Sequence, residues 1–121
     1  NRLYEKLQVV SDKLILPQAT EHAVPSWFGF IVTCKEGVDR NKVVPYIEEK
    51  GVQTRMLFAG NLTKHPCFDG MRRNQSGYRV VGDLTVTDTI MENSFWVGVY
   101  PGMTDEMIDY MAKTMIEAVE E

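Results

Sequence analysis

Five side chains of this sequence are of the types that bind sugars and phosphates. Arg55 and Arg79 each carry a guanidinium group, whose planar fork of N–H donors matches the oxygens of a phosphate or diphosphate. Asn61 could hydrogen-bond a sugar hydroxyl, and His65 could titrate near neutral pH beside a substrate. Phe28 could pack on a sugar or a base. We therefore predict that these five residues contribute to substrate binding.

Each of these side chains also has a purely structural explanation. Arg55 could form a surface or interdomain ion pair, and Arg79 could be a surface arginine at the start of a helix. Asn61 could close an Asx-turn, and His65 could be a solvated loop histidine. Phe28 could lie in the core, because aromatic residues in strands are mostly buried. The sequence alone leaves both explanations open.

The other ionisable and nucleophilic residues give no sign of a catalytic or metal site. Cys34 and Cys67 do not form a CxxC pair, so neither a zinc ribbon nor a redox dithiol is indicated. Cys34 lies in an apolar run and is expected to be a buried, reduced thiol. A solvated helix face is expected to hold Asp83, Asp88 and Glu92. Glycine-rich nucleotide loops, HExxH and GxSxG are all absent from the sequence.

Hydrophobic periodicity predicts an α/β domain with a three-stranded sheet and helices packed against it. Runs rich in β-branched and aromatic residues predict strands at 26–34, 52–58 and 94–100. Amphipathic patterns predict helices at 1–10, 39–50 and 80–92 and a final helix after Thr104. Residues 60–79 are expected to be a long functional or flexible loop.

Individual residues refine these predicted elements. Asp39 or Asn41 could cap the second helix, and the latter choice would move Pro45 toward the first turn, where proline is tolerated. Thr104 is the expected N-cap of the last helix, and Gly51 is expected in the left-handed conformation after the second one. Trp27 and Phe28 are expected on opposite faces of their strand, with one of them in the core.

Charge and hydropathy argue against two classes of partner. The formal net charge of −4 disfavours nucleic acid, and the densest basic pair, Arg72-Arg73, is expected in a solvated loop. The longest apolar runs are far shorter than the ~20 residues that cross a bilayer, so a cytoplasmic protein is expected.

The 121 residues suggest one domain, and the sequence starts without methionine, as if inside a helix, which favours a fragment or a processed chain.

Three segments of the sequence resemble a known family. They are Pro25-Ser-Trp-Phe-Gly-Phe, Gly51-Val-Gln-Thr-Arg-Met-Leu-Phe-Ala-Gly-Asn-Leu and Ser94-Phe-Trp-Val-Gly-Val-Tyr-Pro-Gly-Met-Thr. In this order they resemble the carboxy-terminal part of nucleotide-sugar aminotransferase-like enzymes, which use pyridoxal or pyridoxamine phosphate (PLP or PMP). The resemblance covers residues 1–118 and is stronger to a narrower group, the 3-dehydrases of lipopolysaccharide biosynthesis that act on CDP-4-keto-6-deoxy-D-glucose.

The resemblance implies a fold and a chemistry for the parent enzyme. The chain would be the small carboxy-terminal domain of a fold-type I PLP enzyme, with residues 1–20 as connecting helix and linker. The parent would be a cytoplasmic homodimer that uses PMP and a 2Fe–2S cluster to remove the C3 hydroxyl of a CDP-sugar. An iron–sulfur flavin reductase would supply electrons, and the product would lead to the 3,6-dideoxyhexoses of O-antigen.

The sequence departs from the full family pattern, because the segment that would hold the cofactor, the histidine base and the cluster ligands is absent from it. Cys34 and Cys67 do not reproduce the closely spaced cluster cysteines. We therefore expect no catalytic residue, cofactor or metal in this chain. The alternatives are the same domain of a PLP-dependent sugar aminotransferase, with a lysine in place of the histidine, and a non-catalytic α/β binding module.

Overall fold

The computed structural model describes residues 2–121, and its framework is a four-stranded antiparallel sheet with the strand order β1-β2-β4-β3. The strands are β1 (Leu14–Ile15), β2 (Gly29–Cys34), β3 (Thr54–Met56) and β4 (Ser94–Gly98). The predicted α/β class is confirmed. The sheet has one strand more than predicted, because β1 forms within the range 1–20 that was expected to be only helix and linker.

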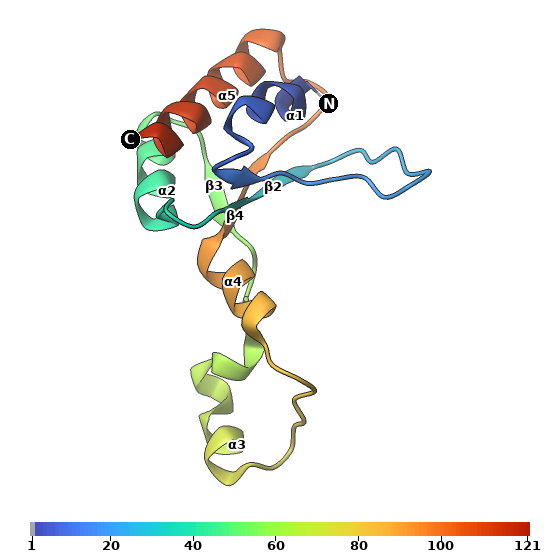
Figure 1. Cartoon of the computed structure of the whole chain (residues 1–121), viewed down its shortest axis with the longest axis vertical. Helices are drawn as coiled ribbons and strands as arrows, with labels where there is room; N and C mark the ends of the chain where they lie inside the picture. Colours follow the sequence, from blue (N-terminus) through green and yellow to red (C-terminus); the bar gives the residue numbers. More distant parts are fainter. Residues whose placement is uncertain (1) are drawn as a thin grey trace.

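Helices cover one face of this sheet. They are α1 (Arg2–Leu7), α2 (Arg40–Glu49) and α5 (Asp105–Glu120), and the 3-10 turn η1 (Gln8–Val10) follows α1. Figure 1 shows α1 and α5 side by side above the strands and α2 at the left, below the C-terminal end of α5, and α5 contacts both α1 and α2. Among the described helices, none is long and apolar enough to cross a membrane.

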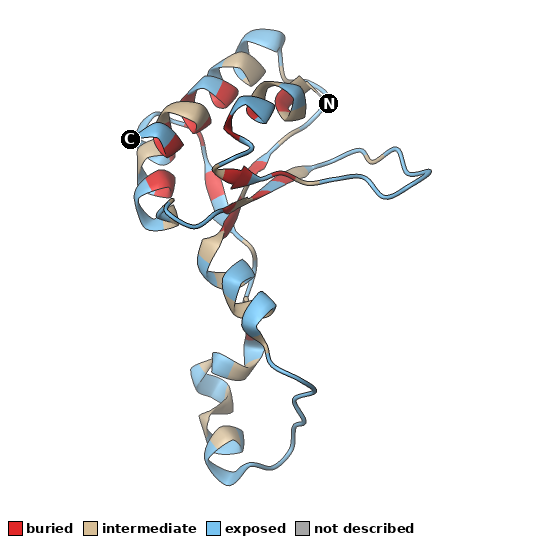
Figure 2. Cartoon of the chain, viewed as in Figure 1, coloured by how far each residue is buried: buried red, intermediate tan, exposed pale blue. Residues whose placement is uncertain are grey.

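The core lies between these helices and the strands, where the buried residues of Figure 2 gather. Alternate residues of β2 point toward the helices, and Phe30 and Val32 are therefore buried. Phe95 on β4 is fully buried, and Met115 of α5 is fully buried as well. Complete burial of a side chain of this size contributes about 1.5–3 kcal/mol. Cys34 belongs to this core, so its expected burial is confirmed.

Local capping explains where the longer helices begin. The Asp39 carboxylate accepts a hydrogen bond from the Asn41 backbone N–H at 2.9 Å, so Asp39 is the N-cap of α2 and the alternative cap at Asn41 is wrong. The Thr104 hydroxyl accepts from the Met107 N–H at 3.3 Å and caps α5, as predicted. Gly51 follows α2 with φ +81°, which confirms its predicted left-handed conformation.

Two segments extend away from this compact body (Figure 1). Residues 16–28, here called the arm, connect β1 to β2 and are largely exposed. Residues 60–84, here called the lobe, hang from helix α4 (Thr85–Asn93) and contain three short helical segments. These are η2 (Leu62–Lys64), η3 (Pro66–Phe68) and α3 (Asp69–Asn74).

The arm and the lobe correct three expectations. Trp27 and Phe28 lie before the first residue of β2 and are 37% and 74% exposed, so neither takes the core position, which Phe30 fills. The predicted loop 60–79 is partly helical. The helix expected at 80–92 begins only at Thr85, since Gly82 with φ +72° cannot continue a right-handed helix.

Candidate functional site

A groove of about 770 Å³ runs along the β3 edge of the sheet, between the strands and the first turns of α5. It brings together two of the five predicted site residues, Phe28 from the end of the arm and Arg55 from β3. Its lining includes Gln53, Trp96, Tyr100, Glu106, Met107 and Tyr110. The volume lies within the range of pockets that enclose small ligands, and aromatic walls with a few polar groups are typical of such pockets.

Arg55 is held in this groove by neutral partners only. Its Nη1 donates to the Thr54 carbonyl oxygen at 3.1 Å. The Gln53 amide, turned so that its oxygen faces the guanidinium, accepts from both Nη1 and Nη2 at 3.0 Å. Among the described residues no carboxylate forms an ion pair with Arg55. The guanidinium therefore keeps its charge available for an anionic ligand.

The aromatic part of the groove is built around Trp96. Its ring and that of Phe28 meet edge to face, with centroids 5.9 Å apart and an interplanar angle of 76°. Gly29 allows this arrangement, because a Cβ there would lie 2.7 Å from the indole ring. The Phe28 carbonyl accepts from the Val99 N–H at 2.9 Å, which extends the β2–β4 ladder by one bond and fixes the base of the arm.

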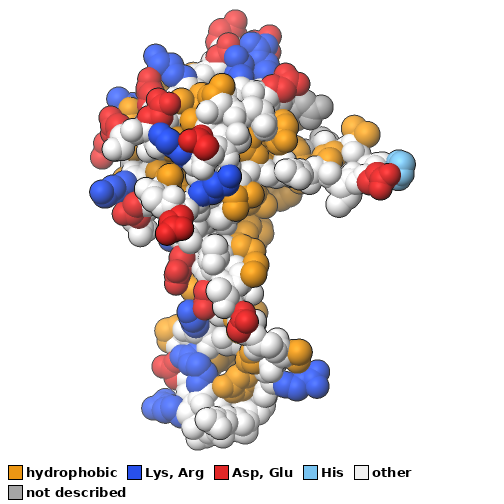
Figure 3. Space-filling view, in the orientation of Figure 1, with side chains coloured by type: hydrophobic (Ala, Val, Ile, Leu, Met, Phe, Trp, Pro, Cys, Tyr) orange, Lys and Arg blue, Asp and Glu red, His pale blue; other side chains and the backbone are white. Residues whose placement is uncertain are grey.

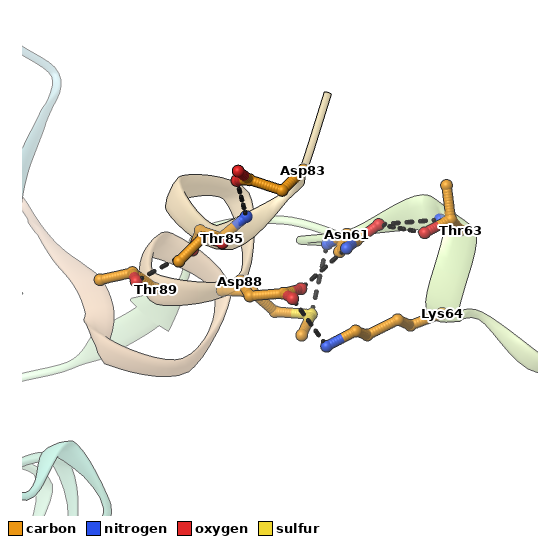
Figure 4. A network of polar contacts seen from close by, with 8 residues as sticks. Asn61, Thr63, Lys64, Asp83, Thr85, Asp88 and Thr89 are labelled. Carbon is orange, nitrogen blue, oxygen red and sulfur yellow. Dashed lines mark hydrogen bonds and ion pairs between the residues drawn. The ribbon is translucent and has the colours of Figure 1, made fainter. Parts of the chain in front are cut away.

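A second cluster joins the lobe to α4 through Asn61 and Asp88 (Figure 4). Asn61 is 2% exposed, and its Nδ2 donates to the Asp88 carboxylate at 2.7 Å. Its Oδ1 accepts from the Thr63 N–H at 3.1 Å and from the Thr63 hydroxyl at 2.7 Å. Lys64 pairs with the other Asp88 oxygen at 2.9 Å. We call these four residues, Asn61, Thr63, Lys64 and Asp88, the clasp.

The clasp changes the interpretation of two residues. Asp88 was expected on a solvated helix face, yet its carboxylate is bonded twice, and the hydrogen bond from Asn61 and then the contact with Lys64 lower its pKa. Asn61 was predicted to contact a sugar. Its side-chain oxygen and amide already bond within the chain, so the geometry favours the Asx-turn explanation, while a direct contact with substrate stays a prediction.

Side-chain hydrogen bonds form at both ends of helix α4. At its C-terminus, Arg40 of α2 donates from Nη1 to the Met91 carbonyl at 2.6 Å and to the Ser94 carbonyl at 3.3 Å, which satisfies carbonyls that the helix leaves free. At its N-terminus, Asp83 accepts from the Thr85 N–H at 3.1 Å, and this bond lowers the Asp83 pKa. The helix therefore connects the lobe to the body as a fixed element.

The remaining predicted site residues lie in the lobe, outside the groove. The His65 Nε2 lies 2.5 Å from the Ala59 carbonyl oxygen. Arg72 donates to the Thr63 carbonyl and, at 2.9 Å, to the His65 carbonyl, and it pairs with Asp69. Arg72 thus organises the lobe, and the expectation of a solvated loop arginine is wrong for it. Arg79 is exposed in the extended segment before α4.

The lobe has no buried apolar core of its own. Its apolar side chains enclose a small cavity of about 200 Å³ and lie partly open to solvent. The cavity is lined by Leu62, Thr63, Phe68, Met71, Arg72, Gly77 and Tyr78. Figure 3 shows basic side chains at several places on the outside of the lobe together with acidic groups, and both kinds of charge are also mixed on the body. Polar bonds, and not hydrophobic burial, therefore define the shape of the lobe.

The thiols and acidic groups do not form a metal site within residues 2–121, where no set of three His, Cys, Asp or Glu side chains is placed to hold an ion. Cys34 and Cys67 are both free, the first buried and the second exposed. Burial raises the pKa of the Cys34 thiol to about 11. The buried thiol is therefore protonated and unreactive at neutral pH.

Sequence reasoning missed Trp96 as a groove residue. One sign was present in the sequence, because Trp96 stands between Phe95 and Val97, and alternation along a strand sends it to the opposite face from these core residues. Its position beside Arg55 follows from the β3–β4 register, in which the two residues are partners. That register depends on a pairing between distant parts of the chain.

Two curated relatives match nearly the whole chain. The lipopolysaccharide biosynthesis protein RfbH of Salmonella typhimurium is 47% identical over 117 residues, which are 95% of this chain and 26% of that protein. The dTDP-4-dehydro-2,6-dideoxy-D-glucose 3-dehydratase of Saccharopolyspora spinosa is 45% identical over 108 residues, 88% of this chain and 22% of that protein. The chain thus spans about a quarter of the length of these relatives.

Solved structures with the same fold include sugar-nucleotide enzymes. A substituted form of GDP-4-keto-6-deoxymannose-3-dehydratase with bound GDP-perosamine has a TM-score of 0.75 at 25% identity, over 94% of this chain and 29% of its own. The Escherichia coli GDP-4-keto-6-deoxy-D-mannose-3-dehydratase with bound hydrated PLP has a TM-score of 0.75 at 23% identity, over 93% of this chain and 28% of its own. The fold of the chain is therefore that of a part of these PLP enzymes.

The description of the family agrees with the resemblance found in the sequence. The DegT/DnrJ/EryC1/StrS aminotransferase family matches residues 1–116, which include the groove, the clasp and nearly all of α5. The chain belongs to the DegT/DnrJ/EryC1/StrS aminotransferase family.

Proposed function

We propose that this chain is the small carboxy-terminal domain of a nucleotide-sugar 3-dehydratase and that its groove binds part of the substrate. The observation that carries the proposal is the 47% and 45% identity to two relatives, one named for lipopolysaccharide biosynthesis and the other a sugar 3-dehydratase. The parent enzyme would remove the C3 hydroxyl of CDP-4-keto-6-deoxyglucose, and its product would serve the synthesis of 3,6-dideoxyhexoses for O-antigen.

The cofactors of such an enzyme do not fit the residues described here. A 2Fe–2S cluster requires several cysteine ligands close together, whereas Cys34 is buried in the core and Cys67 is exposed in the lobe. The lining of the groove includes neither a lysine nor a histidine that could serve as the base beside a PMP or PLP ring. We therefore assign both groups to other parts of the parent protein.

The contribution of this chain would be to bind and orient the substrate. Arg55 presents a guanidinium bonded only to neutral oxygens, which suits a diphosphate. Phe28 is 74% exposed and offers a ring face for the sugar or the base. Binding energy from these contacts holds the reacting sugar in one orientation, and closure over the groove excludes water.

Asn61, His65 and Arg79 are retained as predicted substrate contacts of the parent enzyme, though they do not lie in the groove. For Asn61 and His65 a substrate contact requires that the ligand meet the base of the lobe, where both residues already bond to the chain. Arg79 is exposed and free of this requirement. The homodimer and the iron–sulfur flavin reductase partner belong to the same proposal.

An aminotransferase is the second candidate function, because the matching family is described as an aminotransferase family. In that case the substrate would also be a nucleotide sugar, and the groove would play the same part. The residue that faces the cofactor in the parent protein separates the two functions: a histidine favours dehydration and a lysine favours amino transfer.

The test uses the full-length parent enzyme with CDP-4-keto-6-deoxyglucose as substrate. We expect Arg55→Ala to lower kcat/KM about 10- to 100-fold, since a hydrogen bond to a charged group contributes about 1.5–3 kcal/mol. The matched control is Arg73→Ala, an exposed arginine of the lobe, with kcat/KM within twofold of the wild type. A wild-type enzyme that leaves the C3 hydroxyl in place would refute the dehydratase, and an unchanged Arg55→Ala would remove Arg55 from the site.

A further inference from the structure

The face of the sheet opposite the helices carries a row of three side chains across neighbouring strands. Ile31 on β2 is the register partner of Trp96 on β4, and Trp96 is the partner of Arg55 on β3. Residues directly opposite in antiparallel strands have Cβ atoms about 4.5–5.5 Å apart, so the side chains of Trp96 and Arg55 start from neighbouring positions on the same face. Both are part of the groove.

We propose that Trp96 and Arg55 together form a subsite for a nucleoside diphosphate, with the base against the aromatic wall and the diphosphate at Arg55. This inference rests on the proposed function, and it names which half of the substrate the groove takes. It also gives Trp96 the role of the residue on which the base stacks.

The aromatic wall suits a flat ring. The indole of Trp96 lies against Gly29, where the absence of a Cβ leaves room for it, and the Phe28 ring meets it edge-on at 5.9 Å. Tyr110 lines the same groove, and its hydroxyl donates to the Lys50 carbonyl at 2.8 Å, which fixes the position of that ring. Stacking of a base on aromatic side chains is a common mode of nucleotide binding and tolerates all bases.

One polar atom of the wall has unused capacity. The Trp96 Nε1–H is the buried side-chain donor that lacks a hydrogen-bond partner within the described residues. Such groups are rare in folded proteins, because water or a ligand usually satisfies them. The neighbouring Phe28 ring is 74% exposed, and an acceptor on a base bound at this wall would complete the bonding of the indole.

The charges of the groove select the ligand class. Arg55 offers its fork to an anion, and the Glu106 carboxylate can accept from the amino group of a base. A free sugar would leave the guanidinium without an anion, and free pyrophosphate would leave the aromatic wall uncovered. A ligand that carries both a planar ring and a diphosphate uses the whole groove.

The test is calorimetric binding of CDP and of inorganic pyrophosphate to the full-length protein. We expect Trp96→Leu to weaken CDP binding at least tenfold and to leave pyrophosphate binding within twofold. We expect Trp96→Phe to retain most of the CDP affinity, whereas Arg55→Ala should weaken the binding of both CDP and pyrophosphate. The matched control is Trp27→Leu, a tryptophan of the arm outside the groove, which should bind CDP as the wild type does.

Binding of CDP to Trp96→Leu within twofold of the wild type would overturn the inference. Where that variant does not fold, 5-fluorotryptophan is incorporated into the wild-type protein and the Trp96 resonance is assigned by its absence in Trp96→Phe. CDP should shift this resonance, pyrophosphate should not, and the lack of a CDP shift overturns the subsite.

The two proposals fail separately in these experiments. If Trp96→Leu binds CDP with the wild-type affinity and converts the nucleotide sugar with the wild-type KM, the subsite is refuted and the proposed function is unaffected. CDP binding that depends on Trp96 in a protein without any nucleotide-sugar activity would do the reverse.

Discussion

Replacing Asn61 with alanine separates the two roles that its position in the sequence suggests. In the structure, its Oδ1 accepts two hydrogen bonds from Thr63 and its Nδ2 donates to Asp88, all within the clasp. Alanine removes all three bonds and leaves the first turn of η2 without a cap. We therefore expect the lobe to open more often, whether or not any substrate is present.

The magnitude follows from the capping contacts. An Asn→Ala change at a capping position costs about 0.5–2 kcal/mol. The lost bond to Asp88 acts in the same direction. A change of 1.4 kcal/mol is tenfold in an equilibrium constant, so the cap alone predicts a 2- to 30-fold larger open population, roughly. Backbone amides of residues 62–74 should exchange with solvent faster by the same factor.

Hydrogen exchange measured by mass spectrometry on the full-length protein checks this expectation. The matched control is Asn74→Ala, an exposed asparagine at the end of α3, which should leave the exchange of the lobe unchanged. Unchanged lobe exchange in Asn61→Ala, together with a tenfold higher KM for the nucleotide sugar, would refute the reasoning. Asn61 would then contact the substrate, as its residue type first suggested.

Three further predictions concern single groups. Because its pKa is lowered, Asp88 stabilises the lobe above its unfolded pKa of about 3.9 and loses this effect as the pH falls through its folded value. The backbone amides of the lobe should be better protected from hydrogen exchange in the wild type than in Asp88→Asn. This difference should be constant from pH 8 to 5 and should shrink below about pH 4. Iodoacetamide at pH 8 should label the exposed Cys67 and spare Cys34, whose buried thiol has a pKa of about 11, as peptide mapping will show. Gly60→Ala should lower the urea midpoint more than Gly51→Ala, because both glycines have positive φ but only a Cβ at Gly60 overlaps an α4 side chain.

Much of the body could be predicted because its signals are local. The capping residues Asp39 and Thr104 stand directly before apolar helical patterns, and Gly51 stands directly after one. Strands β2 and β4 are rich in β-branched and aromatic residues. Such patterns bury one face of an element whatever its neighbours are, so the sequence is sufficient to locate them.

The missed elements lack a local signal. Strand β1 has only two residues, Leu14 and Ile15, and it exists because they pair with Cys34 and Thr33 of β2 across the arm. The short helices of the lobe contain no buried residue, so no apolar periodicity marks them. They are held by side-chain bonds to backbone carbonyls, such as those from Arg72, which a sequence pattern does not show.

The predicted site was scattered for a related reason. Residue types alone suggested both Arg55 and Asn61, since each is a polar residue in or shortly after one short strand segment. The strand order β1-β2-β4-β3 then places Arg55 beside Trp96, on the open face of the sheet, while the chain turns at Gly60 and carries Asn61 away to α4. Only the three-dimensional pairing separates these two surroundings.

The groove and the clasp differ in how many of their hydrogen-bonding groups lack a partner, and this difference indicates which of them is the better binding site. In the clasp, the Asn61 amide and the Asp88 carboxylate bond to one another and to neighbouring residues of the chain, so a ligand would have to replace existing bonds. In the groove, Arg55 bonds only neutral oxygens, and the indole N–H of Trp96 has no partner among the described residues. A ligand gains most where it satisfies groups that the protein leaves unsatisfied, because it then replaces fewer bonds. We therefore propose that the groove carries the binding role and that the clasp holds the lobe in place.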